Sequence, residues 1–526
     1  MKSIYSILCL AFLLGPGPVC AGSVKDLPDG TTVVTVECWR LPDKSRTDTL
    51  TKADVAVLRE FVRRWMEGWE ETLPDGTVKR HPSIYEQRYR ARYEADPATY
   101  GRHDWSKVEL RLDDSWIRHK ELKGTDMRGV GQLAMEKGKS ADVVYVTFRH
   151  SDAYIKNGFL YPLDKPEDGY LSAMTKEERD FAIHGNLWPV IKRRGPEGNE
   201  HVWAMPFGGV LGRVMLYRKD LLDGAGIPYP TNEWTWEDFL VACKKLTNPA
   251  EGTYGVRFGR GNSESWFWTS FLWSAGGEVQ VHDAERDEWR FAFDSRAAAV
   301  ALEFYNRLCC ERWVDGTGRE RRGYAFREPE GGAKWSAGEI GFWAMYINDR
   351  VLGRIDPEVT GMVALPWGYP DRNGKRHRGG ELNCRLFALS SSTKSPVVRD
   401  AAWEYIRFYE SKDAVRIRIQ AMVDGGLGRL VNPRYLRLFG HEELVAQVPK
   451  GWEEAYKIAI ATGKAAPHGR NCMYAYYLMT KPINKAEELA RKGKLPTDWG
   501  ERLALLRVLL RQAVAEANAW EPPQRP

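Results

Sequence analysis

VWAMPFGGVLGRVMLYRKDLLDGAGIPYPTNEWTWEDFL, residues 202–240, is the stretch of sequence that decides the fold. Residues 203–207 form a short apolar run, and residues 214–217 form a second run of branched and aromatic side chains, which is typical of β-strands. Between these runs stand Gly208 and Gly209, whose backbone can absorb the changes in φ and ψ that a hinge requires. The stretch therefore predicts a chain that passes between two lobes through a glycine-softened connection.

The second half of this stretch predicts a turn followed by a capped helix. Glycine and proline interrupt regular structure over residues 224–230. Thr235 precedes an apolar helical pattern and stands three residues before Asp238, which is the spacing of a capping box. Strands that alternate with helices in this way favour an α/β fold.

These residues resemble the central signature of the family 1 extracellular solute-binding proteins, the maltose-binding-protein type that serves ABC importers. The resemblance rests first on MPFGG and on VMLYRKDLLDGAGIPYPTNEWTWEDFLVACKKLTNPAEGTYGVRFG, which stand in the family's order over residues 205–259. Further matching segments are MEKGKSADVVYVTFRH at 135–150, NGFLYPLD at 157–164, WSAGEIGFWAMYINDRVLG at 335–353 and the segment at 363–411.

The resemblance implies an α/β, two-lobe periplasmic-binding-protein fold of type II. Each lobe is expected to hold a mainly parallel sheet flanked by helices, with the ligand cleft between the lobes. The expected lobes are residues 22–210 with 385–445, and residues 211–384 with 446–526. Residues 66–103 depart from the family pattern and are rich in arginine, tyrosine and glutamate. We interpret them as an inserted helical segment, for which a solvated charged face is the simplest role.

The N-terminus predicts export. Lys2, the apolar residues 4–14 and the small-residue site Val19-Cys20-Ala21 have the pattern of a secretory signal peptide, which we assign to residues 1–21. Its apolar run is too short to span a membrane. Cleavage after Ala21 would leave a periplasmic protein. Acylation of Cys20 stays open as an alternative and would leave a membrane-anchored lipoprotein.

The composition argues against several classes of partner. The formal charge of +6 is the small difference between 77 basic and 71 acidic residues, so it does not indicate a nucleic-acid-binding surface. The six cysteines beyond the signal peptide form no CxxC pair and have no histidine at zinc spacing, so we expect no metal site and no cofactor. The 21 tryptophans suit the stacking of flat ligands such as sugars, although a large core also uses tryptophan.

Aromatic and polar residues that follow predicted strands are the candidates for ligand binding, because open α/β sheets place ligands beyond the carboxyl ends of their strands. Sugar faces stack on aromatic rings, and sugar hydroxyls need donors and acceptors. The predicted ligand-binding residues are Trp39, Asp43, Lys44, Phe148, Arg149, His150, Phe207, Trp266, Trp268, Trp343, Glu381, Asn383 and Tyr474.

Several alternatives stay open among these candidates. Trp266 and Trp268 lie on one side if the chain is extended there and on different sides if it is helical. Trp343 is preferred over Tyr346 as the stacking ring, and Tyr474 over Tyr477. The ligand could also be a uronate-type anion, because three arginines could pair with its carboxylate: Arg149, Arg213 and Arg385.

The function implied by the resemblance is capture of a mono- or oligosaccharide by lobe closure, followed by delivery to the permease of an ABC transporter. We expect a monomer without catalytic residues. A secreted carbohydrate-active enzyme is one alternative, but no pair of carboxylates is marked out by its spacing. A sensory protein that presents its ligand to a membrane receptor is the other, because one fold serves both roles.

Overall fold

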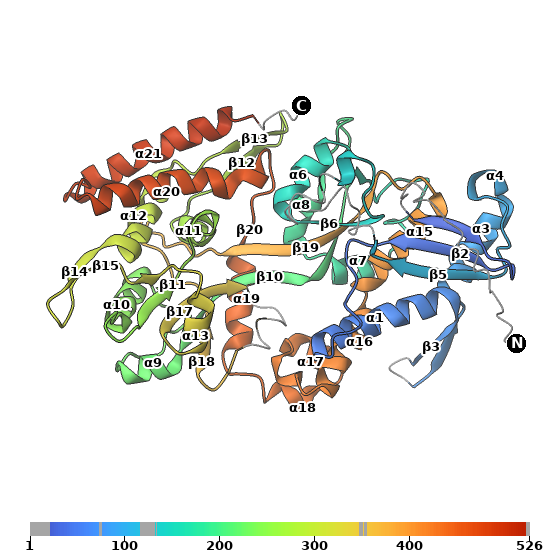
Figure 1. Cartoon of the computed structure of the whole chain (residues 1–526), viewed down its shortest axis with the longest axis horizontal. Helices are drawn as coiled ribbons and strands as arrows, with labels where there is room; N and C mark the ends of the chain where they lie inside the picture. Colours follow the sequence, from blue (N-terminus) through green and yellow to red (C-terminus); the bar gives the residue numbers. More distant parts are fainter. Residues whose placement is uncertain are drawn as a thin grey trace, which may run out of the picture. The chain divides into compact units, whose positions relative to one another are not determined.

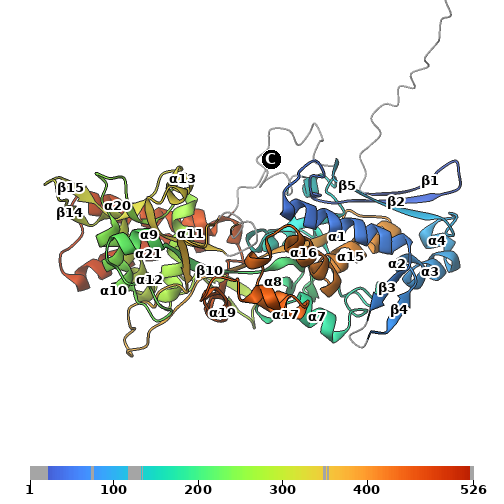
Figure 2. The same cartoon turned by 90° about the horizontal axis from the view of Figure 1, so that it is seen from below.

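The computed structural model describes residues 22–72, 76–115, 132, 134–346, 351 and 355–521. The predicted signal peptide over residues 1–21 lies outside the described residues. The described chain divides into two compact units, whose helices and strands are labelled in Figures 1 and 2. Because their boundaries are not those of the predicted lobes, the division into lobes stays a prediction.

The first unit contains a three-stranded sheet. It comprises the described residues of Met1–Leu41, Val62–Val144 and Leu389–Glu404. The strands are ordered β1 (Ser23–Asp26), β2 (Thr32–Glu37) and β5 (Val108–Asp113). β1 runs antiparallel to β2, whereas β5 runs parallel to it. The strand predicted over residues 31–39 is confirmed as β2, in which Val33, Val34 and Val36 are buried.

The inserted segment belongs to this unit and is only partly helical. It folds as a hairpin followed by short helices: β3 (Trp69–Thr72), β4 (Val78–His81), α2 (Ile84–Arg88), α3 (Arg90–Ala95) and α4 (Pro97–Tyr100). Nη1 of Arg88 lies 2.8 Å from Oε1 of the buried Glu404, and Arg92 pairs with the buried Asp400. The segment is therefore tied to the unit by ion pairs, and a merely solvated charged face was an incomplete interpretation.

The second unit comprises Pro42–Phe61, Tyr145–Ala388 and Tyr405–Pro526 as far as these are described. The main path of its sheet is β16 (Ala325–Phe326), β11 (Tyr254–Arg257), β17 (Ile340–Tyr346), β10 (Met205–Arg218), β19 (Glu381–Ser390) and β20 (Lys464–Ala465), and β18 (Thr360–Val363) also pairs with β10. β11 is parallel to both neighbours, whereas β10 is antiparallel to β17, β18 and β19. The sheet is therefore mixed, and a mainly parallel sheet was too simple an expectation.

The two strands predicted within residues 202–240 are one long strand, β10, with an irregularity in its middle. Phe207 pairs with Arg385 and Leu211 with Asn383, so the strand spends two more residues than β19 between these pairs. Gly208 and Gly209 occupy this step with φ of 74° and 72°, a region that favours glycine.

The turn and the capped helix that follow are confirmed. The predicted capping box is present, because Oγ1 of Thr235 accepts from the backbone of Asp238 and the Asp238 carboxylate accepts from the backbone of Thr235. Helix α10 (Trp236–Leu246) follows this cap.

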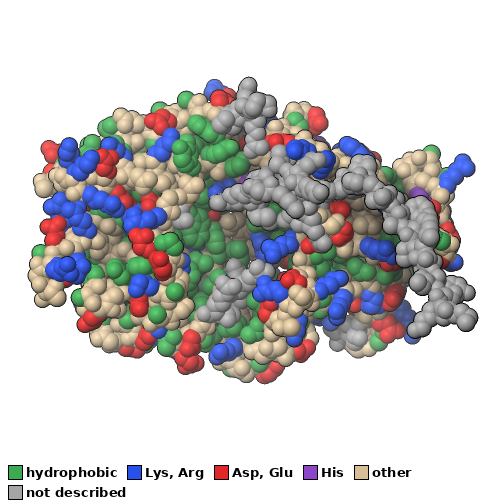
Figure 3. Space-filling view, in the orientation of Figure 1, with side chains coloured by type: hydrophobic (Ala, Val, Ile, Leu, Met, Phe, Trp, Pro, Cys, Tyr) green, Lys and Arg blue, Asp and Glu red, His purple; other side chains and the backbone are tan. Residues whose placement is uncertain are grey.

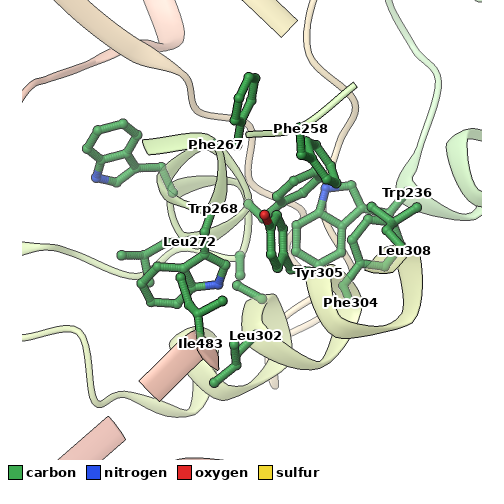
Figure 4. Packing of buried hydrophobic residues seen from close by; sticks show 14 of the residues in the cluster. Trp236, Phe258, Phe267, Trp268, Leu272, Leu302, Phe304, Tyr305, Leu308 and Ile483 are labelled. Atoms are coloured by element: carbon green, nitrogen blue, oxygen red, sulfur yellow. The ribbon is translucent and has the colours of Figure 1, made fainter. Parts of the chain in front are cut away.

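Helices cover the sheet of the second unit and enclose an aromatic core. The remaining longer helices are α6 (Phe148–Lys156), α11 (Asn262–Ser274), α12 (Arg296–Cys310), α16 (Lys412–Asp424), α19 (Trp452–Thr462), α20 (Ala475–Arg491) and α21 (Trp499–Ala519), while α1 (Thr49–Met66) and α15 (Pro396–Tyr409) run through both units. Figure 4 shows part of this core, in which Trp236 stacks on Phe304 with ring centroids 4.4 Å apart. Burial of such rings is the main favourable term in folding.

Shorter elements connect these helices. They are β6 (Val143–Val146), β7 (Leu160–Tyr161), α7 (Lys176–Ala182), α8 (Trp188–Ile191), β8 (Lys192–Arg194), β9 (Glu200–Val202), α9 (Lys219–Gly224), β12 (Gln280–Asp283), β13 (Glu288–Phe291), β14 (Arg312–Val314), β15 (Glu320–Arg322), α13 (Gly331–Ser336), α17 (Pro433–Leu438), α18 (Glu442–Val445) and four-residue or shorter 3₁₀ turns.

The surface carries charged side chains of both signs, as the composition predicts. Figure 3 shows acidic and basic side chains intermingled over the face in view. Among the described residues, no helix is both long enough and apolar enough to cross a bilayer.

Candidate functional site

A buried arginine organises the candidate site of the second unit. Arg213 of β10 is 1% exposed, and its Nη2 lies 2.6 Å from Oε2 of the equally buried Glu381. Its Nη1 donates to the carbonyl oxygen of Trp266 and to Oγ of Ser270, each at 2.7 Å. A guanidinium this deeply buried is stable only when charge and hydrogen bonds compensate it, so this pair fixes β10, β19 and α11 at one point.

Aromatic rings flank the guanidinium of Arg213. Its Cζ lies 3.8 Å from the ring centroid of Trp266 and 5.3 Å from that of Tyr346, within the range of cation–π attraction. The two rings meet at 67° with centroids 5.6 Å apart. Nδ2 of Asn383 lies 3.4 Å from the hydroxyl of Tyr346. Two partly exposed rings and an amide are thus held around one fixed cation.

Helices α20 and α6 complete the arrangement. The hydroxyl of Tyr476 donates to Oε1 of Glu381 at 2.9 Å, and Cζ of Arg149 lies 4.7 Å from the centre of the Tyr476 ring. Burial, followed by the negative charge of Glu381, raises the pKa of both Tyr476 and Tyr346. Both phenols therefore stay protonated at neutral pH, where the Tyr476 hydroxyl donates to Glu381 and the Tyr346 hydroxyl accepts from Asn383.

We call these seven residues the arginine–aromatic cluster: Arg149, Arg213, Trp266, Tyr346, Glu381, Asn383 and Tyr476. Its members divide into two layers by exposure. Arg213, Glu381 and Tyr476 are buried, whereas the other four side chains are half-buried. The buried layer fixes the orientation of the half-buried one, which offers a ligand two rings, an amide and a guanidinium.

Four of the residues predicted from the sequence meet in this cluster. They are Arg149 of α6, Trp266 of α11, and Glu381 and Asn383 of β19, so three elements of the second unit contribute them. Arg213 and Tyr346, which the sequence offered only as alternatives, are also members. Tyr476 was missed in favour of Tyr474 and Tyr477. Because α20 begins at Ala475, Tyr476 is in line with the buried Met479 and Ile483, while Tyr477 is exposed.

Two further predicted residues lie in the core of the second unit. Trp268 is 0% exposed and packs near Leu302 and Ile483 (Figure 4). Phe148 is 1% exposed at the start of α6. Burial favours a packing role for both side chains, and their role in ligand binding stays a prediction.

The other predicted aromatic residues have partners outside the cluster. Phe207 stacks on Phe387 with centroids 3.7 Å apart, and Trp343 lies 4.4 Å from Cζ of Arg257. Tyr474 packs on Trp520 with centroids 4.3 Å apart. Trp343 and Tyr346 stand three residues apart on β17, so they point to opposite faces of the sheet.

The remaining predicted residues are polar or lie near the boundary of the first unit. Nδ1 of His150 is 2.6 Å from Oγ1 of Thr147. Asp43 and Lys44 are exposed, and Oδ1 of Asp43 accepts from the backbone of Ser45. Trp39 is half-buried in the first unit, where its amide donates to Val143. Their role in ligand binding stays a prediction.

A pocket of about 390 Å³ adjoins the glycine step of β10. Its wall includes Met362, Leu430 and Trp452, which share a hydrophobic cluster with Val214 and Leu216. Since side chains alternate along a strand, Val214 and Leu216, and with them this part of the wall, lie on the face of β10 opposite to Arg213.

A charged network lines the same pocket. Oε1 of the buried Glu410 accepts from the amide of Gly208 at 2.6 Å, and Arg418 lies 3.7 Å from Glu410 and 3.3 Å from Asp54. Burial raises the pKa of Glu410. The backbone of the glycine step is therefore held by a carboxylate that directly follows helix α15.

The fold defines the class of protein. The chain has the α/β fold of the type II periplasmic binding proteins, as solved structures with this fold demonstrate. An ABC substrate-binding protein from Listeria monocytogenes, in complex with cycloalternan, is 14% identical with a TM-score of 0.55; the match covers 92% of this chain and 98% of that one. The cyclic alpha-maltosyl-1,6-maltose binding protein from Arthrobacter globiformis is also 14% identical with a TM-score of 0.55, over 93% and 99%. The GacH receptor of Streptomyces glaucescens, solved unliganded and with acarbose, is 14% identical with a TM-score of 0.54, over 92% and 98%.

The sequence defines the family. Residues 121–416 match the family of bacterial extracellular solute-binding proteins, and the chain belongs to it. The members of this family are binding proteins. A search of curated protein sequences finds no match to the chain.

Proposed function

We propose that this protein captures a mono- or oligosaccharide outside the cytoplasm and delivers it to the permease of an ABC importer. The observation that carries the proposal is the convergence of Trp266, Tyr346, Asn383 and Arg149 around the buried pair of Arg213 and Glu381. Rings beside an amide and a guanidinium are the chemistry that a sugar needs, because its apolar faces stack and its hydroxyls pair with donors and acceptors. The ligands of the structural relatives, which include cycloalternan and acarbose, support the same class.

Closure of two lobes is the mechanism that we propose for capture. The positive φ angles of Gly208 and Gly209 and the break in register beside them support a hinge at this point of β10. A ligand that binds the closed form better than the open one shifts the equilibrium toward closure. The lobe boundaries expected from the sequence, the signal peptide over residues 1–21, a periplasmic location and a monomeric state belong to the same proposal.

A titration tests the proposal. The mature protein is titrated calorimetrically with neutral mono- and oligosaccharides, the corresponding uronic acids, a polyamine and a short peptide. We expect saturable binding of at least one carbohydrate and a weaker response in Trp266→Ala. Trp499→Ala is the matched control, since Trp499 is an exposed tryptophan at the start of α21. Binding of the polyamine or the peptide without any carbohydrate would overturn the ligand class.

The same sample separates binding from catalysis. After prolonged incubation with the tightest carbohydrate, chromatography should return it chemically unchanged. Appearance of shorter sugars that scales with protein concentration would favour a carbohydrate-active enzyme instead.

A further inference from the structure

A buried carboxylate in the first unit lacks a cationic side chain. Asp142 is 0% exposed and stands immediately before β6. Oδ2 accepts from the backbone nitrogens of Gly22 at 2.8 Å and Glu37 at 2.9 Å, and Oδ1 accepts from Oγ1 of Thr393 at 2.7 Å. Among the described residues, no lysine, arginine or histidine forms an ion pair with this carboxylate.

This environment is costly for a negative charge. Burial raises the pKa of Asp142, and the hydrogen bonds from Thr393, Glu37 and Gly22 oppose that rise. An ionised carboxylate removed from water loses its hydration, and hydrogen bonds from neutral groups return only part of that loss. A positive charge beside Oδ2 would complete the compensation.

The backbone nitrogen of Gly22 is the one donor to this carboxylate that can acquire a charge. It follows directly after Ala21, where the small-residue pattern predicts cleavage of the signal peptide. Before cleavage this nitrogen is a neutral amide with a single proton. After hydrolysis of the bond between Ala21 and Gly22 it is an α-ammonium group with three protons, which is charged at neutral pH.

Only glycine fits at this position. A Cβ atom on residue 22 would lie 2.1 Å from the carbonyl oxygen of Thr35, 2.6 Å from Oδ2 of Asp142 and 2.8 Å from Cγ1 of Val398. The next residue, Ser23, begins β1 and pairs with Thr35 of β2. The strand therefore delivers the nitrogen of residue 22 to Asp142, and the absence of a side chain lets it approach.

We propose that the mature chain begins at Gly22 and that its α-ammonium group is the counter-ion of Asp142. The inference rests on the signal peptide in the proposed function, but it does not depend on the ligand. It also distinguishes cleavage after Ala21 from acylation at Cys20. Acylation would make Cys20 the first residue and leave the nitrogen of Gly22 as an uncharged amide, whereas cleavage after Ala21 creates the ion pair.

The first test is the mass and N-terminal sequence of the protein exported by a bacterial host. The expected mature chain starts at Gly22. A chain that starts at an acylated Cys20, or at another residue, would overturn the inference. Failure of sugar binding leaves this result untouched, so the two proposals can fail separately.

The second test is a double-mutant cycle on the melting temperature of the mature protein. One change adds a single alanine before Gly22, and the other is Asp142→Asn. We expect the added alanine to lower the Tm by several degrees in the natural chain and to have little further effect in Asp142→Asn. Asp29→Asn, at an exposed turn after β1, is the control for loss of a nearby charge. Equal effects of the alanine in both backgrounds would contradict the ion pair.

A labelling measurement keeps the test independent of variants that fold poorly. The natural mature protein is treated with limiting acetic anhydride at neutral pH, and the modified fraction of the α-amine is compared with that in urea. The ion pair predicts acetylation several-fold slower in the native protein. Equal rates in both states would refute it.

Discussion

Removing the negative charge of Glu381 tests whether the buried pair supports the arginine–aromatic cluster. In Glu381→Gln the side chain keeps its shape, but the guanidinium of Arg213 loses the carboxylate that lies 2.6 Å from its Nη2. Arg213 would then be a buried cation with neutral acceptors alone: the glutamine amide oxygen, the Trp266 carbonyl and Oγ of Ser270. Breaking a buried pair from one side costs about 3–5 kcal/mol, because the other charge stays uncompensated.

Urea denaturation measures this cost as a fall in the free energy of unfolding. We expect a fall of about 3 kcal/mol in Glu381→Gln. The double variant Arg213→Met with Glu381→Leu should regain much of it, since removing both charges leaves no buried ion. Sugar affinity should fall in both variants, because the amide of Asn383 and the rings of Trp266 and Tyr346 lose their fixed support. A Glu381→Gln protein within about 0.5 kcal/mol of the natural chain would refute this reasoning.

Other changes test individual features. Trp266→Ala should weaken sugar binding by about 1–2 kcal/mol, whereas Trp343→Ala, on the other face of β17, should change the calorimetric affinity by less than half of that. Gly208→Ala should lower the free energy of unfolding by about 1–2 kcal/mol, because φ is 74° there and a Cβ would meet Nη2 of Arg385; no loss in a urea titration would contradict the strained step. Thr235→Ala should cost about 1 kcal/mol by the same assay, and a neutral effect would argue against the capping box. Burial lowers the pKa of His468 to about 4, so the unfolded chain binds the proton more readily than the folded one. The free energy of unfolding should therefore fall on the order of 2 kcal/mol as the pH drops from 6.5 to 4. In His468→Gln, urea titrations across this pH range should show a correspondingly smaller fall.

Local features of the fold could be predicted from the sequence. The capping box of Thr235 and Asp238 is confirmed because both partners stand within one helical turn. The two runs at residues 203–207 and 214–217 were correctly assigned as strand, but not as one strand. Short patterns do not reveal that β19 continues to pair with β10 on both sides of the glycine step.

The candidate site was only half predictable, because its central contacts are not local. Arg213 and Glu381 are 168 residues apart, and no sequence pattern indicates that they pair. Trp266 and Trp268 illustrate a different limit. In helix α11, residues two positions apart are separated by about 200° around the helix axis. The ring of Trp266 therefore reaches the cluster, whereas the ring of Trp268 enters the core. The choice between them required knowing that this segment is helical.

Hydrogen–deuterium exchange with and without the tightest-binding carbohydrate tests the central claim most directly. We predict that peptides containing Trp266, Tyr346 and Asn383 become protected when the sugar is bound, while the core peptides of helix α12 around Phe304 exchange equally slowly in both states. Saturating sugar that leaves the exchange of all three former peptides unchanged would contradict a binding site at the arginine–aromatic cluster.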